Sequence, residues 1–268
     1  MVNVMENNDK ILQTKNKTYL WSSIIIYLIT LFIFASVAAL VIANIIARAW
    51  NLDKQILMQC ISAKDFSEFE APYIKANAIS QGWGNFIGYA VALAFVAFFM
   101  RGFLKEDFNK IREKKKYYLI LIPTAALLFC GIGLLIDYLV GLLVPSSNNQ
   151  STIEFIILNG GAFPMIASVL LAPILEELIY RKAIFSLCKP YGVLAGYILS
   201  ILFFVLPHMI SSDMSNIGIW LLQCIPYLAS AFMLAFIYHK SNYNIYASIT
   251  AHLLNNIIAV VLVFIQKG

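Results

Sequence analysis

Residues 170–185 read LLAPILEELIYRKAIF. Glu176, Glu177 and Arg181 interrupt a run that is otherwise almost wholly apolar. A charged side chain at the centre of a bilayer costs roughly 2.5–3.5 kcal/mol on insertion scales, so such groups usually face a cavity and have partners. The stretch therefore predicts a membrane-spanning helix that turns a charged face toward the interior of the protein.

The composition of the whole chain indicates the same class. Of 268 residues, 61% are hydrophobic and 12% are charged, and the mean hydropathy is +0.79. Soluble domains carry about 25% charged residues, so this chain has too little polar surface to be one. We predict an all-α, polytopic membrane bundle with a buried polar cavity, and no soluble domain. The four cysteines form no CxxC pair, which argues against a disulfide framework or a thiolate metal site.

About seven to eight transmembrane helices are expected from the apolar runs. The predicted spans are 20–47, 83–101, 117–144, 155–187, 191–210, 216–238 and 245–265. Pro173 is expected to kink the fourth span, which is long enough to be tilted or broken. Residues 48–82 are mixed and polar, and they are expected to hold a re-entrant or amphipathic helix or an eighth crossing. The basic segment 105–116, KEDFNKIREKKK, is predicted to be a loop.

Basic residues set the predicted orientation. They gather in residues 1–18, in the 105–116 segment, at 181–189 and at Lys240, while the segments 145–153 and 211–216 hold none. Cytoplasmic loops of membrane proteins carry the excess of Lys and Arg. For seven spans this places the N-terminus inside and the C-terminus outside, so the net charge of +5 is a topology signal rather than a sign of nucleic-acid binding.

The two glutamates have different local surroundings. Glu177 and Arg181 are four residues apart and share a helix face, so we expect a structural ion pair. Glu176 lies about 100° round the helix and has no local counter-charge. A carboxylate of this kind suits a general base or acid, and Glu176 is our candidate for a catalytic or ion-translocating role, with a second structural hydrogen-bonding group as the alternative.

Two other spans carry polar pairs with the same spacing. Phe204 and His208 share one face of the fifth span, and Pro207 is expected to loosen that helix. His252 and Asn256 share one face of the seventh span, where the alternative is simple helix–helix hydrogen bonding. Counted from the predicted helix ends, Glu176, His208, His252 and Asn256 fall within about two to three turns of mid-bilayer. His208 falls furthest toward the outer side, and the four side chains are expected to share one cavity.

This set of side chains has two chemical interpretations. A carboxylate, two imidazoles and a carboxamide can activate water and stabilise an oxyanion. If a metal is bound instead, its predicted ligands are Glu176, His208 and His252, which are ligand types that zinc prefers. No HExxH motif is present, and no serine or cysteine has a histidine partner at motif spacing, so a covalent nucleophile is not indicated.

The three motifs together resemble the CPBP family, which comprises the CAAX prenyl endopeptidases and bacteriocin-processing intramembrane proteases and is also called the Abi family. That family's signature is EExxxR, FxxxH and HxxxN or HxxxD on successive helices. Here the motifs read EELIYR at 176–181, FVLPH at 204–208 and HLLNN at 252–256. The resemblance covers about residues 155–265. Lys182 departs from it, because many relatives have glycine after the arginine.

The resemblance implies a role for each residue. Glu176 and His208 would bind and activate the attacking water, while His252 and Asn256 would stabilise the oxyanion. Glu177 and Arg181, with Phe204, would support the site. The chain is then divided into a cytoplasmic segment at 1–18, N-terminal transmembrane helices and loops at 19–150, and a catalytic CPBP-like core at 151–268 that forms one structural unit with 19–150. Whether enzymes of this family need a metal has been argued both ways. A metal-free, glutamate-dependent mechanism fits these residues and is expected, with bound zinc as the alternative.

Three functions are weighed on this basis. The first is an intramembrane endopeptidase that cleaves a membrane-associated peptide or protein in a bacterial plasma membrane and uses no nucleotide. The second is a non-catalytic CPBP-like scaffold, regulator or immunity protein. The third is a proton-coupled transporter, since Glu and His within a membrane are also proton-relay residues; carriers usually show repeated halves, and no repeat is found here.

Overall fold

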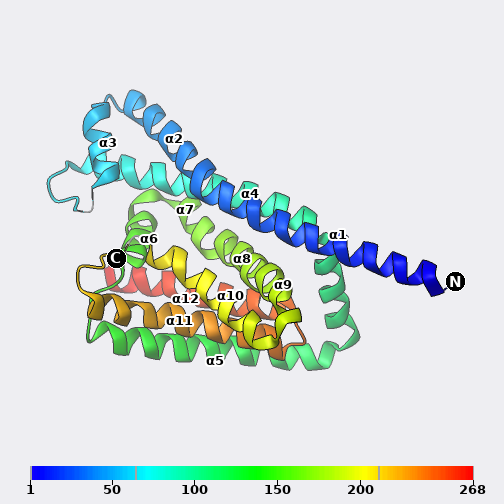
Figure 1. Cartoon of the computed structure of the whole chain (residues 1–268). Coiled ribbons are helices and arrows are strands. Elements are labelled where there is room, and N and C mark those ends of the chain that lie inside the picture. The colour runs from blue at the N-terminus through cyan, green and yellow to red at the C-terminus, as the bar shows by residue number, and fades with distance from the viewer. Residues whose placement is uncertain (1, 64, 211, 268) are drawn as a thin grey trace.

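The computed structural model describes residues 2–63, 65–210 and 212–267, with side chains over 16–63, 65–210 and 212–266. Every regular element in those ranges is a helix, which confirms the predicted all-α class. Figure 1 shows two layers, a long N-terminal hairpin and a bundle of C-terminal helices, with a broken helix between them.

The N-terminal layer is a helical hairpin. Its elements are α1 (Val2–Ile29), the π-helical turn η1 (Thr30–Phe34), α2 (Ala35–Ala49), α3 (Lys54–Ser62) and α4 (Ala71–Glu113). The helices α2 and α4 pack closely, because glycines on α4 allow backbone contact: a Cβ on Gly84 would lie 2.6 Å from the Cβ of Ala39. Such small residues are typical of helix interfaces in membranes.

The broken helix and the C-terminal bundle complete the fold. Their elements are α5 (Lys115–Gly141), α6 (Asn148–Gly160), α7 (Ala162–Ile166), the π-helix η2 (Ala167–Leu171), α8 (Ala172–Glu177), the π-helix η3 (Leu178–Phe185), α9 (Ser186–Cys188), the 3₁₀ turn η4 (Lys189–Tyr191), α10 (Val193–Met209), α11 (Ile217–Lys240) and α12 (Ile245–Lys267). In Figure 1, α5, α11 and α12 run side by side, and α7 to α9 lie between them and the hairpin.

Six helical segments among the described residues are long and apolar enough to cross a membrane. They are Asn16–Ala49, Ala71–Glu113, Lys115–Gly141, Ala162–Tyr191, Ile217–Lys240 and Ile245–Gln266. The remaining predicted span, 191–210, is the helix α10. Its 17 residues give about 25 Å of helix at 1.5 Å per residue, which is short of the roughly 30 Å of a hydrocarbon core.

The predicted loop at 105–116 is wrong. The helix α4 continues to Glu113, and only Lys114, with φ −115° and ψ 43°, separates it from α5. Lys, Glu and Arg are good helix formers, and ion pairs support this polar end: Lys110 Nζ lies 3.0 Å from Glu106 Oε1 and 2.9 Å from Asp107 Oδ1. Low hydropathy here marks an exposed helix end rather than a loop.

The segments before α4 and around the fourth predicted span also differ from expectation. Within 48–82 the short helix α3 is followed by the start of α4, which begins twelve residues earlier than the predicted span. The fourth span is broken at Gly161, whose φ of +89° suits glycine. Beyond that break, the π-helix η2 comes immediately before Pro173, where the missing N–H and the ring disturb regular α-helix.

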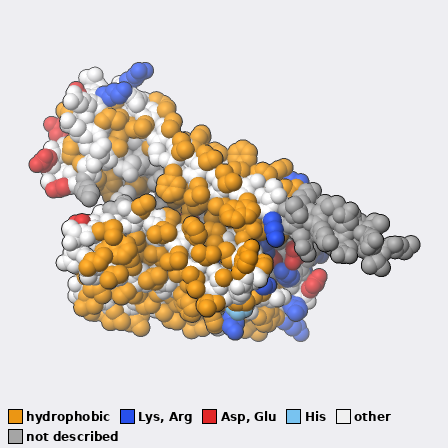
Figure 2. Space-filling view, in the orientation of Figure 1, with side chains coloured by type: hydrophobic (Ala, Val, Ile, Leu, Met, Phe, Trp, Pro, Cys, Tyr) orange, Lys and Arg blue, Asp and Glu red, His pale blue; other side chains and the backbone are white. Residues whose placement is uncertain are grey.

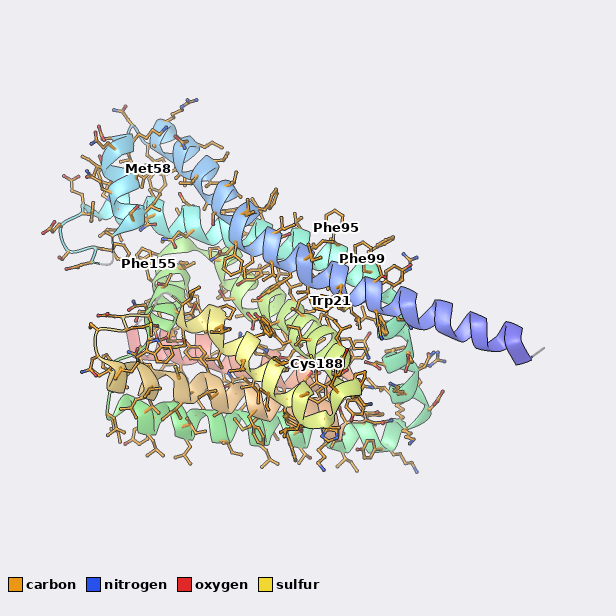
Figure 3. The ribbon with its side chains drawn as sticks, viewed as in Figure 1. Trp21, Met58, Phe95, Phe99, Phe155 and Cys188 are labelled. Atoms are coloured by element: carbon orange, nitrogen blue, oxygen red, sulfur yellow. The ribbon has the colours of Figure 1, made fainter. Side chains whose placement is uncertain are left out.

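The surface of the middle of the molecule is apolar. Figure 2 shows hydrophobic side chains across this face, with Lys, Arg, Asp and Glu toward its ends. In Figure 3, Trp21, Phe95 and Phe99 project along the hairpin, and the first two are more than half exposed. Because the described residues include six apolar spans, this is a lipid-facing surface, and the protein is a multi-pass membrane protein.

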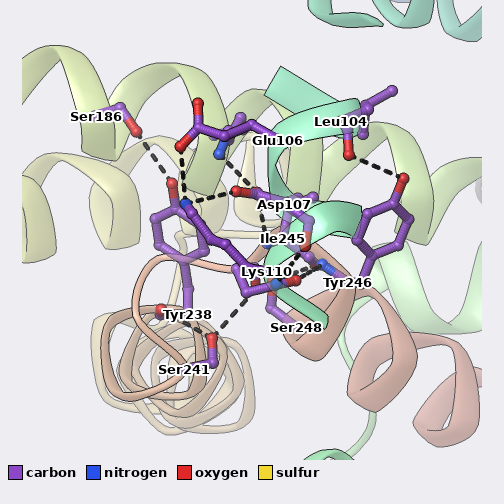
Figure 4. Close-up of polar contacts among 12 residues, drawn as sticks. Leu104, Glu106, Asp107, Lys110, Ser186, Tyr238, Ser241, Ile245, Tyr246 and Ser248 are labelled. Carbon is purple, nitrogen blue, oxygen red and sulfur yellow. Dashed lines mark hydrogen bonds and ion pairs between the residues drawn. The ribbon is translucent and has the colours of Figure 1, made fainter. Parts of the chain in front are cut away.

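A fully buried aspartate, Asp107, joins three parts of the fold (Figure 4). Its Oδ2 accepts a hydrogen bond from Lys182 Nζ at 2.6 Å and from the backbone N–H of Ile245 at 3.0 Å. Asn244 Nδ2 donates to the Asp107 carbonyl at 2.8 Å. The first backbone donors of a helix need such partners, so Asp107 fixes the beginning of α12 against α4 and η3. It also provides a partner for Lys182, the residue that departs from the CPBP pattern.

Replacing Asp107 by asparagine leaves the buried Lys182 ammonium without a counter-charge. Breaking a buried pair in this way destabilises a protein by about 3–5 kcal/mol. We expect Asp107→Asn to lower the free energy of unfolding by this amount in detergent micelles, measured by thermal or denaturant unfolding. The control is Glu106→Gln, which removes the exposed partner of Lys110 and should cost at most about 1 kcal/mol. Equal stability of the two variants would contradict this account.

Candidate active site

Both glutamates of the opening stretch are buried at the end of α8. Glu176 is 8% exposed and Glu177 is fully buried, as is Arg181 in the following π-helix. All eight residues of η3 are buried, so these charges lie in the middle of the protein and not against lipid. π-helical segments are often found at functional sites, and here one begins directly after the acidic pair.

The predicted pairing of Glu177 with Arg181 is confirmed. Arg181 Nη1 lies 3.4 Å from Glu177 Oε1. The guanidinium also donates from Nη2 to the carbonyl of Ala231 in α11 at 3.1 Å, and its carbon lies 4.7 Å from the centre of the Phe204 ring. Arg181 therefore neutralises Glu177 and joins η3 to both α10 and α11.

A histidine from α12 contacts both glutamates. His252 Nδ1 is 3.1 Å from Glu177 Oε1, and its Nε2 is 3.9 Å from Glu176 Oε2. A carboxylate only accepts hydrogen bonds, so the short contact places the hydrogen on Nδ1 and points Nε2 toward Glu176. Glu177 thus fixes both the ring orientation and the tautomer of His252.

Asn256, one helical turn beyond His252, bonds to the broken helix. Its Nδ2 donates to the Ser168 carbonyl at 3.0 Å. That carbonyl lacks the usual donor, because the N–H of Ala172 bonds to Ala167 and Pro173, the next residue, has no N–H. Asn256 satisfies this acceptor, so Pro173 and the π-helical turn decide where the carboxamide sits.

His208 lies beside the cluster, on α10. Its Nδ1 is 2.7 Å from the Phe204 carbonyl, which leaves Nε2 as the nitrogen with a free lone pair in the neutral ring. The imidazole stacks on Phe204 at 4.7 Å and lies 5.0 Å from the Tyr227 ring. Phe204 also lies 6.0 Å from His252, so one aromatic ring separates the two histidines.

The structure therefore brings four of the side chains into one cluster: Glu176, Glu177, Arg181 and His252. His208 and Asn256 lie at the edge of this cluster. Within the described residues, no hydrogen bond or ion pair joins His208 to Glu176. In the same residues, no three His, Cys, Asp or Glu side chains gather closely enough to hold a metal ion. The zinc ligand set of Glu176, His208 and His252 does not fit this arrangement.

Two contacts of the site were not anticipated from the sequence. The four-residue spacing predicts Arg181 as the partner of Glu177, yet Glu177 also binds His252, which is 75 residues away. The Ser168 carbonyl is absent from the predicted site, although Pro173 five residues later is a signal for a carbonyl without a donor. Asp107, hidden in the segment predicted to be a loop, has no sequence signal of this kind.

Comparison with known proteins gives a match over the part of the chain that holds the site. The family model for type II CAAX prenyl endopeptidases of the Rce1-like kind matches residues 158–258. Over these residues the chain is similar to this family, the CPBP family. The Bacillus subtilis (strain 168) protein named "Putative membrane peptidase YdiL" is 28% identical over 190 residues, which cover 68% of this chain and 72% of that protein. No solved structure matches the chain significantly.

The CPBP match includes the whole cluster described above. All of the residues in the three motifs, from Glu176 to Asn256, fall between residues 158 and 258. The hydrophobic spans among the described residues agree with the similarity to a family of membrane peptidases. The hairpin of α1 to α4 lies outside the matched residues.

The buried ion pair should show strong coupling in a double-mutant cycle. Arg181→Met leaves the buried Glu177 carboxylate without its cation and should cost about 3–5 kcal/mol of unfolding free energy. The double variant Glu177→Gln with Arg181→Met should cost less than the sum of the two single variants, because it leaves no unpaired charge. Exposed Lys105, replaced by Met, is the control. Costs that add within about 0.5 kcal/mol would contradict the pairing.

Proposed function

We propose that this protein is an intramembrane endopeptidase that hydrolyses a peptide bond with a water molecule activated by Glu176. The observation that carries the proposal is the contact of Glu176 with His252 at 3.9 Å, made by two helices inside an apolar bundle. A carboxylate and an imidazole held together out of bulk water suit proton transfer and charge stabilisation. The similarity of residues 158–258 to a peptidase family supports the same chemistry.

In the proposed reaction, Glu176 accepts a proton from water as the water oxygen bonds to the carbonyl carbon of the substrate. The carbonyl oxygen becomes an oxyanion. Glu176 then passes the proton to the amide nitrogen, the C–N bond breaks, and the products are a carboxylate and an amine. His208, whose Nδ1 is held by the Phe204 carbonyl, offers Nε2 to bind the attacking water.

We assign oxyanion stabilisation to His252 and Asn256. This role requires a hydrogen on each ring nitrogen of His252 during the reaction, so that Nδ1–H donates to Glu177 and Nε2–H donates to the oxyanion. The amide of Asn256 has two hydrogens, of which one is used by the Ser168 carbonyl, so the second is free for the oxyanion.

The substrate is proposed to be a membrane-associated peptide or protein, because the site lies within the apolar spans. The test uses purified protein reconstituted into liposomes with a library of membrane-anchored peptides, and mass spectrometry of the products. We expect cleavage by the wild type and none by Glu176→Gln, with unfolding temperatures unchanged. Equal cleavage by Glu176→Gln would overturn the assignment of the base.

Asn256 provides a second test with a close control. Loss of one oxyanion donor typically lowers kcat by about 10²–10³-fold, so Asn256→Ala should slow cleavage by this factor. The control is Asn255→Ala: the same change at the neighbouring residue, whose Oδ1 faces Gly133 of α5 and should leave the rate near that of the wild type. Similar rates for the two variants would contradict the proposed role.

Chelation tests the metal-free form of the mechanism. Because the predicted zinc ligands are not gathered in the described residues, cleavage should persist after treatment with EDTA or 1,10-phenanthroline. Loss of activity that zinc then restores would contradict this prediction and would require the histidines of α10 and α12 to move together.

A further inference from the structure

Two pairs of residues with four-residue spacing lie on the helical segment that carries the acidic residues. Glu177 and Arg181 are one pair, and Glu176 and Tyr180 are the other, each four residues apart. The first pair meets α12 through His252. The second pair meets the N-terminal hairpin, because Tyr180 bonds to Tyr27 of α1.

The contact between the two tyrosines is specific. Their hydroxyl oxygens are 2.9 Å apart, and the rings meet edge to face at 5.9 Å with an interplanar angle of 84°. Tyr27 is 3% exposed and Tyr180 is 2% exposed, so water does not compete for these hydroxyls. One edge of the Tyr180 ring also packs on Phe204, with 5.3 Å between ring centres.

A bond between two hydroxyls leaves one proton unused. One hydroxyl donates to the other, and the second hydroxyl still has a hydrogen to give. Buried donors are nearly always satisfied. Glu176 lies four residues, about one helical turn, before Tyr180 on the same helical segment, while Arg181 pairs with the other carboxylate, Glu177.

We infer that Tyr27 and Tyr180 are positioning residues that direct a hydrogen bond to the carboxylate of Glu176 and hold it in its reactive orientation. This inference rests on the proposed function of Glu176 as the base. It also gives the hairpin a role in the site, since Tyr27 lies outside residues 158–258, to which the family model is matched.

The test removes single hydroxyls and keeps the rings. Tyr27→Phe, Tyr180→Phe and the double variant are compared on a fluorogenic peptide chosen from those that the wild type cleaves. A hydrogen bond to a charged group contributes enough for a loss of roughly tenfold to a hundredfold. We expect kcat to fall by this factor in each single variant while KM stays within about twofold. Because the hydroxyls act as one unit, the double variant should lose little more than the worse single variant.

Tyr238→Phe is the matched control. Tyr238 is equally buried, and its hydroxyl bonds to Ser186 at 3.1 Å instead of facing the site. Its kcat should match that of the wild type. An unchanged kcat in both Tyr27→Phe and Tyr180→Phe, or an equal loss in Tyr238→Phe, would overturn the inference. If Glu176→Gln is inactive while the tyrosine variants are fully active, only the inference fails; if Glu176→Gln is active, the proposed base fails as well.

Discussion

A single buried carboxylate, Glu177, joins the helices on which the site depends. Arg181 from its own helix lies 3.4 Å from Oε1, and His252 from α12 lies 3.1 Å from the same atom. Removing Arg181 would leave the Glu177 charge without its cation in a low-dielectric interior, which costs several kcal/mol. The contacts of Glu177 hold α8, η3 and α12 together and set the orientation of His252 beside Glu176.

Contacts of three further residues hold the helices around Glu177 in place. Asp107 fixes the beginning of α12 about two turns before His252, and it pairs with Lys182 directly after Arg181. Farther along α12, Asn256 binds the carbonyl that Pro173 leaves without a donor. The hairpin approaches from the other side through Tyr27. The cluster of Glu176, Glu177, Arg181 and His252 is thereby surrounded by protein on each side that the described contacts reach.

Local patterns in the sequence predicted the local features. The charges in an apolar run predicted a buried helix, and the four-residue spacing predicted the pair Glu177–Arg181, because both depend only on helix geometry. Low hydropathy wrongly predicted a loop at residues 105–116, where ion pairs support a polar helix end. The contacts of Lys182 with Asp107 and of His252 with Glu177 each join residues 75 positions apart. Such contacts depend on how whole helices pack, and the spacing of residues along one helix does not predict them.

The protons on the ring nitrogens of His252 report directly on its contact with Glu177. The chain has three histidines, so a variant with His208 and His239 replaced by glutamine leaves His252 alone for ¹⁵N imidazole NMR in detergent micelles. The account predicts a hydrogen-bonded proton on Nδ1 that is lost or strongly shifted in Glu177→Gln. An Nδ1 without a proton, or a spectrum that Glu177→Gln leaves unchanged, would contradict the contact from which the site is built.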